Sequence, residues 1–434
     1  MKERLKQWRW PVRLYLVALC KWLLMAVVTG MICGLVGTAF HMGVDQANAL
    51  RMNHPWLLLC LPAAGVAIVG YYKLMQTEGK GTNAVIDQVQ QGNGLPIALI
   101  PSIFIGTVLT HMCGGSSGRE GAALQMGGTV GYQVGAMFHM DDRDLRTATM
   151  AGMAGFFAAL FGTPLTATVF ALMVISVGAV YHVAFIPSLV SSLTAYGVSL
   201  YLGVEPTRFA VTAPDLEMLI LLQVAVLAVL CAMVSILFCS GMHLAEHLMK
   251  KYLPNPWIRA AAGGAILIVL TVLLGTDDYS GAGMGIIARA VEEGTARPEA
   301  FLLKLLFTAV TLSAGFKGGE VVPSFFVGAT FGAVVGPILG LPAGFAAAVG
   351  LVSVFCGAVN CPIASIFLAL ELFGDGGMLY FALACGISDM LSGYTGLYSS
   401  QRILYSKLKA QYINVHTNGH TEGHPTEPSK EPTE

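Results

Sequence analysis

The pattern of apolar and polar positions along this chain consists of long hydrophobic segments separated by short polar breaks. Many segments approach or exceed the roughly 20 apolar residues that a helix needs to cross a bilayer. The pattern therefore predicts an all-α protein with many membrane helices. The apolar segments are Leu14–Gly43, Trp56–Met75, Leu95–Met112, Thr147–Gly203, Met218–Met242, Trp257–Gly275, Phe301–Phe316, Val321–Leu339, Phe345–Phe373 and Met378–Leu391.

Glycines and prolines interrupt several of these segments. Thr147–Val204, which contains no Lys, Arg, Asp or Glu, is long enough for two spans, and we expect breaks at Pro164 and Pro187. Helices that end partway through the membrane need protein or a watery cavity around the exposed backbone. The polar breaks predicted to be loops are Thr77–Gly94, Asp141–Arg146, Glu246–Arg259 and Asp277–Pro298.

Composition supports a membrane protein with many spans. Of the 434 residues, 55% are hydrophobic and 11% are charged, whereas soluble domains are about 25% charged. The apolar segment Leu14–Phe40 is too long for a signal peptide and predicts the first membrane helix. Basic residues dominate the leader at 1–13, so the positive-inside rule predicts a cytoplasmic N-terminus. We expect both termini to be cytoplasmic and the protein to lie in the inner or plasma membrane.

Neither the cysteines nor the C-terminal tail predicts a metal site. The nine cysteines lie in apolar segments without a CxxC pair or zinc spacing, which is typical of reduced packing residues. The tail, residues 413–434, is polar and rich in Thr, Glu, His and Pro, and we expect it to be disordered. His416, His420 and His424 could hold a metal there, but a solvated tail fits the composition better.

One glycine-rich stretch, Gly114–Gly121, interrupts the apolar sequence between two predicted helices. Between Leu95 and Gly135 the only charged residues are Arg119 and Glu120. A charged side chain deep in a bilayer costs about 3 kcal/mol on insertion scales, which favours a functional role. The stretch ends at a helix start, where free N–H groups and the helix dipole attract anions. The alternative is a tight interhelical turn with an ion pair at the membrane edge.

A second stretch, Gly315–Pro323, also places glycines before a helix start. Glu320 is the only charged residue from Gly318 to Leu370. The two stretches are related by an internal repeat, because Gly118, Gly127, Gly131 and Gly135 match Gly319, Gly328, Gly332 and Gly336 at one constant offset, and Pro164-Leu165-Thr166-Ala167 resembles Pro362-Ile363-Ala364-Ser365. Two halves with interrupted helices indicate a transporter with a site at the repeat interface. Glu320 could alternatively be a capping residue facing water.

These motifs resemble the CLC family of chloride channels and anion/proton antiporters. The resemblance rests on Gly118-Arg119-Glu120-Gly121, Gly319-Glu320-Val321-Val322-Pro323, Pro164-Leu165 and Leu397-Tyr398-Ser399, and it covers about Leu14 to Leu408. It implies a homodimer with one pore per subunit and two inverted repeats of tilted, broken helices. The transport domain would span 14–412, with halves at about 14–204 and 216–408.

The resemblance also implies roles for individual residues. Glu120 would be the gating glutamate that competes with the anion and passes protons, and Tyr398 would point its hydroxyl at the anion. Glu320 is the candidate second proton carrier. The other implied anion-binding residues are Gly118, Arg119, Gly121, Gly319, Val321 and Val322.

Three departures from the chloride members favour the bacterial fluoride/proton antiporter branch. The chloride-contacting GSGIP motif is replaced by Gly79-Lys80-Gly81-Thr82-Asn83, and Gly79, Lys80, Gly81 and Thr82 are a candidate anion pathway. The GxFxP motif is replaced by Gly-Glu-Val-Val-Pro, and the internal proton-transfer glutamate is replaced by Val174. One feature fits that branch less well, since it often has Thr where Val322 stands.

The function predicted from the sequence is fluoride export in exchange for protons, with fluoride or chloride, protons and the lipid bilayer as partners. A chloride/proton antiporter or chloride channel of the same family is the alternative. A remote alternative is an intramembrane serine hydrolase, because Gly114-Gly115-Ser116-Ser117-Gly118 matches G-x-S-x-G. Gly79-Lys80-Gly81-Thr82 lacks the order of a P-loop, so we expect no nucleotide, and we expect no nucleic acid, cofactor or enzymatic activity.

Overall fold

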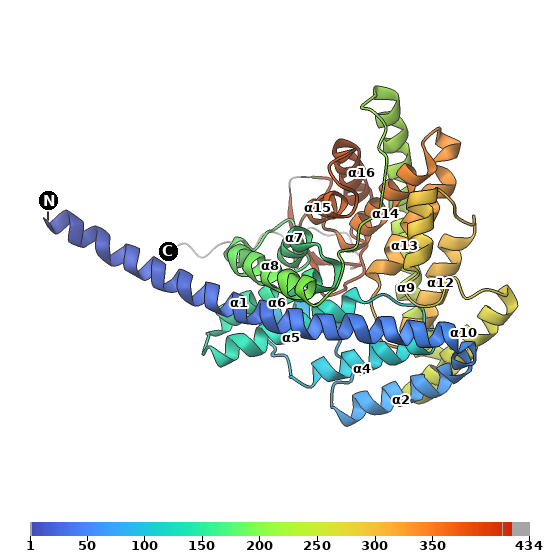
Figure 1. Ribbon diagram of the computed structural model, residues 1–434, viewed down its shortest axis with the longest axis horizontal. Helices are drawn as coiled ribbons and strands as arrows, with labels where there is room; N and C mark the ends of the chain where they lie inside the picture. Colours follow the sequence, from blue (N-terminus) through green and yellow to red (C-terminus); the bar gives the residue numbers. More distant parts are fainter. Residues whose placement is uncertain (1, 410, 419–434) are drawn as a thin grey trace.

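Most of the computed structural model is helical, and it describes residues 2–409 and 411–418, with side chains from residue 16 onward. The first half of the chain carries α1 Lys2–Asn53, the 3-10 helix η1 Pro55–Cys60, α2 Leu61–Leu74, α3 Thr82–Gln91, α4 Leu99–Met112, α5 Glu120–Met137, α6 Asp142–Phe161, α7 Pro164–Met173, the 3-10 helix η2 His182–Ala184 and α8 Phe185–Tyr201. In Figure 1, α1 runs along one side of the molecule, where it packs on α4, α5, α6 and α8.

The second half repeats this kind of arrangement. It carries α9 Met218–Tyr252, α10 Pro256–Leu274, α11 Met284–Ala288, the π-helix η3 Arg289–Glu293, α12 Ala300–Ser313, α13 Val321–Val335, the 3-10 helix η4 Pro337–Leu339, α14 Ala343–Val359, α15 Pro362–Phe373 and α16 Met378–Leu391. Prolines begin α7 and α15, as the matching Pro164 and Pro362 predict, since proline lacks an N–H that the first helical turn would leave unpaired.

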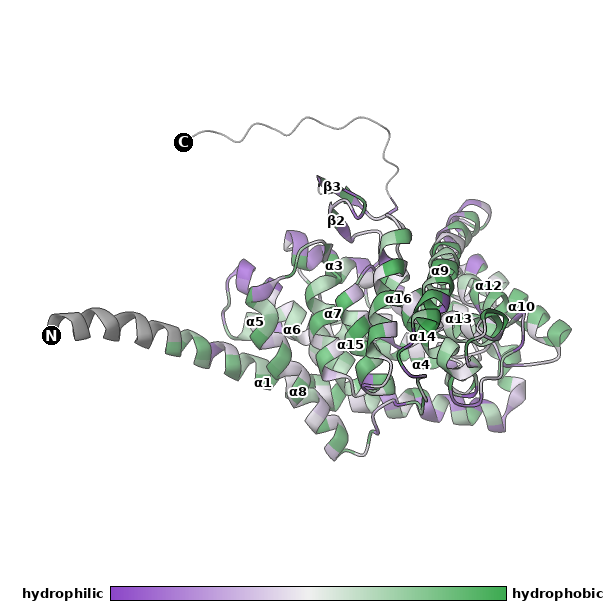
Figure 2. Ribbon diagram, turned by 90° about the horizontal axis from the view of Figure 1, so that it is seen from above, coloured by the Kyte–Doolittle hydropathy of each residue, from purple (hydrophilic) through white to green (hydrophobic). Residues whose placement is uncertain are grey.

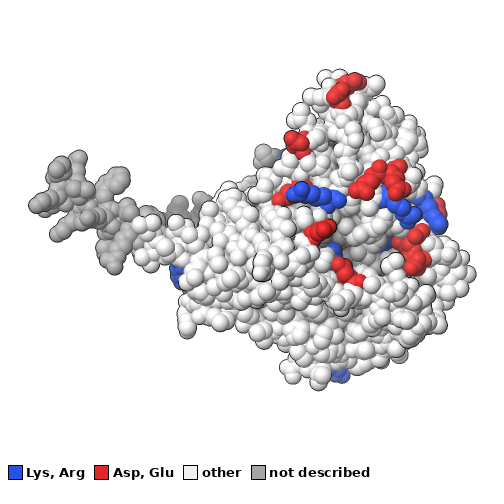
Figure 3. Space-filling model, in the orientation of Figure 1, with Lys and Arg blue, Asp and Glu red and all other residues white. Residues whose placement is uncertain are grey.

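The apolar surface agrees with a membrane protein. Within the described residues, six helices are long and apolar enough to cross a bilayer. Shorter apolar helices of 10–17 residues lie among them, which fits the prediction of helices that end inside the membrane. The outward faces of many helices are hydrophobic (Figure 2), and charged residues on the face in Figure 3 leave a wide uncharged surface.

The uncharged stretch Thr147–Val204 contributes to the three helices α6, α7 and α8, and the break expected at Pro187 is wrong. Pro164 does separate α6 from α7, but the next break lies at residues 174–184. Pro187 lies within the first turn of α8, where its fixed φ and missing N–H are tolerated. Gly162 ends α6 in the left-handed conformation that glycine adopts readily.

Each predicted loop contains some helix. Thr77–Gly94 includes α3, which buries Val85, Ile86 and Val89 while its other face stays polar. The stretch predicted from Asp277 to Pro298 includes α11 and η3, α9 extends to Tyr252, and α6 begins at Asp142. Polar composition alone suggested loops because amphipathic and terminal helical turns carry charged residues too.

A small sheet corrects the predicted boundary of the C-terminal tail. Strand β1 Ser176–Val177 pairs in parallel with β2 Arg402–Tyr405, which pairs antiparallel with β3 Tyr412–His416. The tail was predicted to begin at residue 413, but backbone pairing to β2 orders the chain through β3. Figure 2 shows β2 and β3 at one edge of the molecule. Residues 419–434 of the predicted tail, with His420 and His424, lie outside the described residues.

The repeated glycines allow close helix packing in both halves. A Cβ at Gly131 of α5 would overlap the Ala148 carbonyl oxygen of α6, and a Cβ at Gly332 of α13 would overlap the Ala346 carbonyl oxygen of α14. Most of the constant-offset matches therefore reflect two equivalent helix pairs whose backbones touch, as small-residue motifs allow in membranes.

Gly131→Ala should destabilise the protein by about 1–3 kcal/mol, the typical cost of overpacking. Gly197→Ala in α8 is a matched control, because a Cβ there meets nothing within 4 Å. Thermal unfolding in detergent would measure both variants. Equal melting temperatures for Gly131→Ala and the wild type would contradict the packing role.

Candidate functional site

The two glycine-rich stretches meet at the repeat interface. The Gly118 N–H donates to the Gly319 carbonyl at 2.7 Å, and the Gly319 N–H donates to the Gly118 carbonyl at 2.9 Å. A Cβ at Gly319 would overlap the backbone nitrogen of Gly121, so only glycine permits this approach. The starts of α5 and α13 are thereby held side by side. Because the amides of Gly118 and Gly319 bond to each other, these two predicted anion-binding residues do not offer N–H groups to an anion here.

Glu120 points its carboxylate at the junction between the halves. The side chain is fully buried, and its Oε2 accepts hydrogen bonds from the backbone N–H groups of Arg119 and Val322, both at 3.0 Å. Its Oε1 has no hydrogen-bond partner among the described residues. The first N–H groups of a helix lack intrahelical partners and favour negative charge. The carboxylate therefore occupies a place at the start of α13 that suits an anion.

Glu320 stands at the N-cap position of α13, yet its side chain makes no capping hydrogen bond. It lines a cavity of about 270 Å³ together with Tyr398 and Lys317. A purely structural cap would require a hydrogen bond from a backbone N–H of α13 to the Glu320 carboxylate, and the side chain makes no such bond. The geometry instead presents a carboxyl group to a cavity beside the Glu120 junction.

The Tyr398 side chain is only 2% exposed, and its hydroxyl has no hydrogen-bond partner among the described residues. A buried tyrosine hydroxyl usually finds a partner. Its backbone is fixed by two hydrogen bonds: the Leu397 N–H donates to the Ala358 carbonyl at 2.9 Å, and the Gln401 N–H donates to the Tyr398 carbonyl at 3.0 Å. The hydroxyl is therefore a positioned donor available to a ligand of the cavity.

The predicted anion pathway lines this same cavity, which we call the Tyr398 cavity. Its residues are Gly79, Lys80, Gly81, Thr82, Asn83, Gln125, Met242, His243, Glu246, Leu312, Ser313, Phe316, Lys317, Gly318, Glu320, Leu397, Tyr398 and Ser399. The stretch is fastened to the Tyr398 segment, because Asn83 Nδ2 donates to the Ser399 hydroxyl at 3.0 Å.

Sequence reasoning missed several polar residues of the Tyr398 cavity, among them Gln125 and Lys317. Gln125 donates to the Thr82 hydroxyl at 3.1 Å and lies one turn after Gly121 on α5. The ammonium group of Lys317 lies 4.3 Å from the centre of the Tyr72 ring. Both could have been suspected from the sequence, because Gln125 is a polar residue in an otherwise apolar helix segment and Lys317 lies within the glycine-rich stretch Gly315–Pro323.

Arg119 contacts Glu120 through its backbone and α1 through its side chain. Its backbone N–H bonds to Glu120, but its guanidinium contacts His41 at 2.7 Å and Asp45 at 3.3 Å. Arg119 and Asp45 line a second cavity of about 470 Å³, which we call the Arg119 cavity and which shares no lining residue with the Tyr398 cavity. Two separate cavities thus reach the helix starts that meet at the junction, one at Arg119 before α5 and the other at Glu320 before α13.

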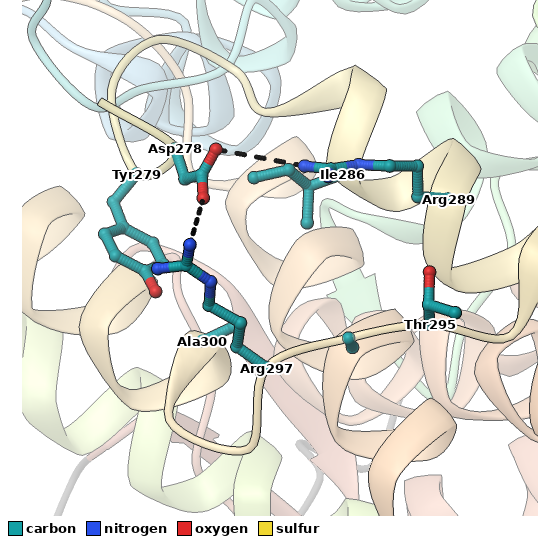
Figure 4. Close-up of a pocket in the computed structure, with 8 residues that line it drawn as sticks. Asp278, Tyr279, Ile286, Arg289, Thr295, Arg297 and Ala300 are labelled. Carbon is teal, nitrogen blue, oxygen red and sulfur yellow. Dashed lines mark ion pairs between the residues drawn. The ribbon is translucent and has the colours of Figure 1, made fainter. Parts of the chain in front are cut away.

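A tightly held loop forms one wall of the Arg119 cavity. The Gly281 N–H donates to the Gly115 carbonyl at 3.0 Å, and buried Lys304 donates to the Gly281 carbonyl at 2.6 Å. Figure 4 shows the neighbouring pocket, where Asp278 lies between Arg289 at 3.8 Å and Arg297 at 3.9 Å. Both arginines are more than half exposed and share one carboxylate, so this pocket is a weaker anion site than the Glu120 junction.

Val174 lies where chloride antiporters of the resembled family have their internal glutamate. It is fully buried at the end of α7, and its carbonyl accepts a hydrogen bond from Gln401 Nε2 at 3.0 Å. Gln401 also donates to the Val359 carbonyl at the end of α14, at 3.0 Å. The position therefore joins the two halves through a neutral amide and offers no carboxyl group for proton transfer.

The geometry does not favour the hydrolase alternative. The Ser116 hydroxyl lies 3.1 Å from the Thr308 hydroxyl. Nδ1 of His111 lies 2.9 Å from the Thr107 carbonyl. A serine nucleophile needs a base at hydrogen-bond distance, and among the described residues no histidine bonds to Ser116.

Comparisons with known proteins identify the family of the chain. Residues 64–393 match the sequence model of the family described as voltage gated chloride channel. The chain belongs to this CLC family. A chloride/fluoride channel protein of Pseudomonas syringae pv. tomato is 34% identical over 94% of this chain and 92% of its own length. An H(+)/Cl(−) exchange transporter of Vibrio cholerae is 24% identical over 90% of each chain.

Solved structures show the same fold. The crystal structure of a CLC-type fluoride/proton antiporter has a TM-score of 0.86 and 34% identity, covering 88% of this chain and 98% of its own. A slow cyanobacterial Cl−/H+ antiporter has a TM-score of 0.73 at 18% identity, covering 86% of this chain and 94% of its own, and at that identity the likeness concerns the fold alone. The predicted family and all-α membrane fold are confirmed.

Proposed function

We propose that this CLC chain is a secondary transporter that exports fluoride from the cytoplasm in exchange for protons. The single observation that carries this proposal is the Glu120 carboxylate, which accepts a hydrogen bond from the first turn of α13. Its sequence neighbour Arg119 lines one cavity, and Glu320 at the start of α13 lines another. A carboxylate in that place can exchange with an anion when it moves and can carry a proton when it is neutral. The 34% identity to a CLC-type fluoride/proton antiporter supports fluoride as the anion.

The donors around the junction suit a small, strongly hydrated anion. Fluoride must exchange its water for several close N–H or O–H donors. The first-turn amides of α5 and α13, among them those of Gly121, Val321 and Val322, supply part of that set. The Tyr398 hydroxyl adds a donor that has no other partner in the described part of the chain.

The Tyr398 cavity and the Arg119 cavity would serve opposite faces of the membrane. With the N-terminus in the cytoplasm, α1 carries Asp45 and Arg51 to the far end, so we place the Arg119 cavity outside. The Tyr398 cavity, with Gly79, Lys80, Gly81 and Thr82, then opens to the cytoplasm, where Glu320 would receive or release protons. We further propose that two copies form a homodimer in the plasma membrane, each with its own pathway.

Fluoride efflux compared with chloride efflux tests the anion assignment. Liposomes containing the purified protein should release loaded fluoride about 100-fold faster than chloride, a difference of about 2.7 kcal/mol in activation free energy. Protein-free liposomes correct for leakage. Equal rates for the two anions would favour a chloride transporter or channel instead.

A further inference from the structure

Three side chains form a polar cluster beside the gate that the transport mechanism above does not use. His41 of α1 lies between Asp45, one turn further along the same helix, and Arg119 at the start of α5. Its Nδ1 is 2.7 Å from Arg119 Nη1, and its Nε2 is 2.9 Å from Asp45 Oδ2. Arg119 Nη1 also reaches Asp45 Oδ1 at 3.3 Å, so the cluster closes into a ring.

The donors and acceptors of this ring fix the tautomer of His41. A guanidinium can only donate hydrogen bonds, and an ionised carboxylate can only accept them. Nδ1 must therefore hold a lone pair toward Arg119, while Nε2 carries the hydrogen that is donated to Asp45. His41 is thus neutral in this arrangement, with its one N–H on Nε2.

A proton added to His41 would break the contact with Arg119. Nδ1 would become a second donor facing Arg119 Nη1, and two cations would stand 2.7 Å apart. The backbone N–H of Arg119 bonds to Glu120 Oε2, the same oxygen that Val322 N–H holds. A shift of Arg119, the N-cap residue of α5, therefore acts on one of the two hydrogen bonds that hold the Glu120 carboxylate in place, the other being the bond from Val322 of α13.

Water in the Arg119 cavity can deliver this proton. Asp45 and Arg119 line the cavity, and the Asp45 side chain is 55% exposed. Among the other helices packed on α1, α4 brings buried His111, whose Nδ1 lies against the Thr107 carbonyl, and α6 brings Asp144, which pairs with Lys21 much earlier on α1. The α8 sequence has no charged residue. Within the described residues, His41 is the only imidazole at hydrogen-bond distance from Arg119.

We propose that His41 is a positioning residue that holds Arg119, and through it Glu120, in the closed arrangement, and that its protonation from the Arg119 cavity releases the gate. This inference rests on the proposed function, since it concerns the control of that transport. Imidazole gains a proton and a positive charge in acid, so transport should accelerate as the pH falls. An exporter under fluoride stress would thereby respond to the acidity that converts fluoride to membrane-permeant HF.

The proposal is tested by measuring fluoride efflux from liposomes at several pH values. The pH is equal on both sides of the membrane, so the result does not depend on the orientation of the protein in the bilayer. The wild type should accelerate about tenfold from about pH 8 to pH 5.5, the change expected from one lost hydrogen bond to a charged group. His41→Gln can accept from Arg119 and donate to Asp45 without titrating, so it should keep the alkaline rate and lose most of the acid rise. His41→Ala, which removes the acceptor, should be fast at every pH.

His54→Gln is the matched control, because exposed His54 at the N-cap of η1 contacts neither Arg119 nor Glu120, and it should follow the wild-type profile. An acid rise in His41→Gln equal to that of the wild type would overturn the proposal. A slow alkaline rate in His41→Ala would also overturn it, because the contact between residue 41 and Arg119 would then not be what keeps the gate closed.

A spectroscopic arm separates this inference from the proposed function. NMR of the ¹⁵N-histidine-labelled full chain, compared with His41→Gln, assigns the His41 signal. At about pH 8 it should show a proton on Nε2 only; a proton on Nδ1 would overturn the inference whatever the transport results. If the wild type moves no fluoride, the proposed function fails, and the spectrum still decides whether His41 accepts from Arg119.

Discussion

Glu120→Gln should reduce fluoride-driven proton movement by about 100-fold, the lower range for loss of a proton-transfer group. The amide oxygen of glutamine can still accept from the N–H groups of Arg119 and Val322, so the side chain should keep its place on α13. It can no longer gain or lose a proton or compete as an anion. The gate would therefore stay closed or turn over without protons, as simultaneous fluoride-electrode and pH-dye recordings would measure.

Glu371→Gln is the control for a carboxylate held in a similar way. Glu371 of α15 accepts from the N–H groups of Leu165 and Thr166 at 2.9 and 2.8 Å and from the Thr166 hydroxyl at 2.6 Å, away from the Glu120 junction. In liposomes, the Glu371→Gln variant should still exchange fluoride for protons, even if the protein has a lower melting temperature. Wild-type proton coupling in Glu120→Gln would exclude Glu120 as the proton carrier.

Glu320→Gln should lose fluoride-driven proton movement while the protein still folds and assembles as a dimer. Val174 removes the usual internal acid, and Glu320 is the carboxyl group that stands next to the α13 start in the Tyr398 cavity. Because the Glu320 side chain caps no backbone N–H, its loss should leave α13 intact. We expect a reduction of about 100-fold in coupled proton flux, with an unchanged elution volume and melting temperature.

Glu246→Gln provides a matched control within the same cavity. Glu246 of α9 is exposed and pairs with Lys250 at 2.5 Å, an arrangement that contributes little when solvated. Its variant should transport and couple like the wild type. Full coupling in Glu320→Gln would place the inner proton route elsewhere and leave Glu320 without a role in transport.

The periodic and chemical signals predicted most of the transmembrane architecture. Long apolar segments indicated the membrane helices, Pro164 and Pro362 indicated the starts of α7 and α15, and the two glycine stretches indicated the starts of α5 and α13. These succeeded because each depends on local properties of the chain. The junction itself could not be predicted, since the mutual hydrogen bonds of Gly118 and Gly319 depend on how the halves pack.

Errors arose where tertiary contacts decided the structure. Strand β3 forms because β2 offers backbone partners, and its short alternating sequence, Tyr412–His416, was hidden in an otherwise polar tail. Likewise, α3 looked like a loop until its apolar face was buried. For the site, the Arg119 guanidinium bonds to His41 and Asp45 of α1, about 75 residues earlier in the chain, and nothing in the sequence pattern predicted these partners. No spacing rule relates such distant positions.

Proton uptake driven by a fluoride gradient tests the claim of antiport most directly. The liposomes are loaded with fluoride and have equal pH inside and outside, and potassium with valinomycin clamps the membrane voltage to zero. Coupling to fluoride efflux is then the only force that moves protons inward. The account predicts that the lumen acidifies as fluoride leaves, and that protein-free and Glu120→Gln liposomes do not acidify. Rapid fluoride release with unchanged lumenal pH would contradict it and identify a channel.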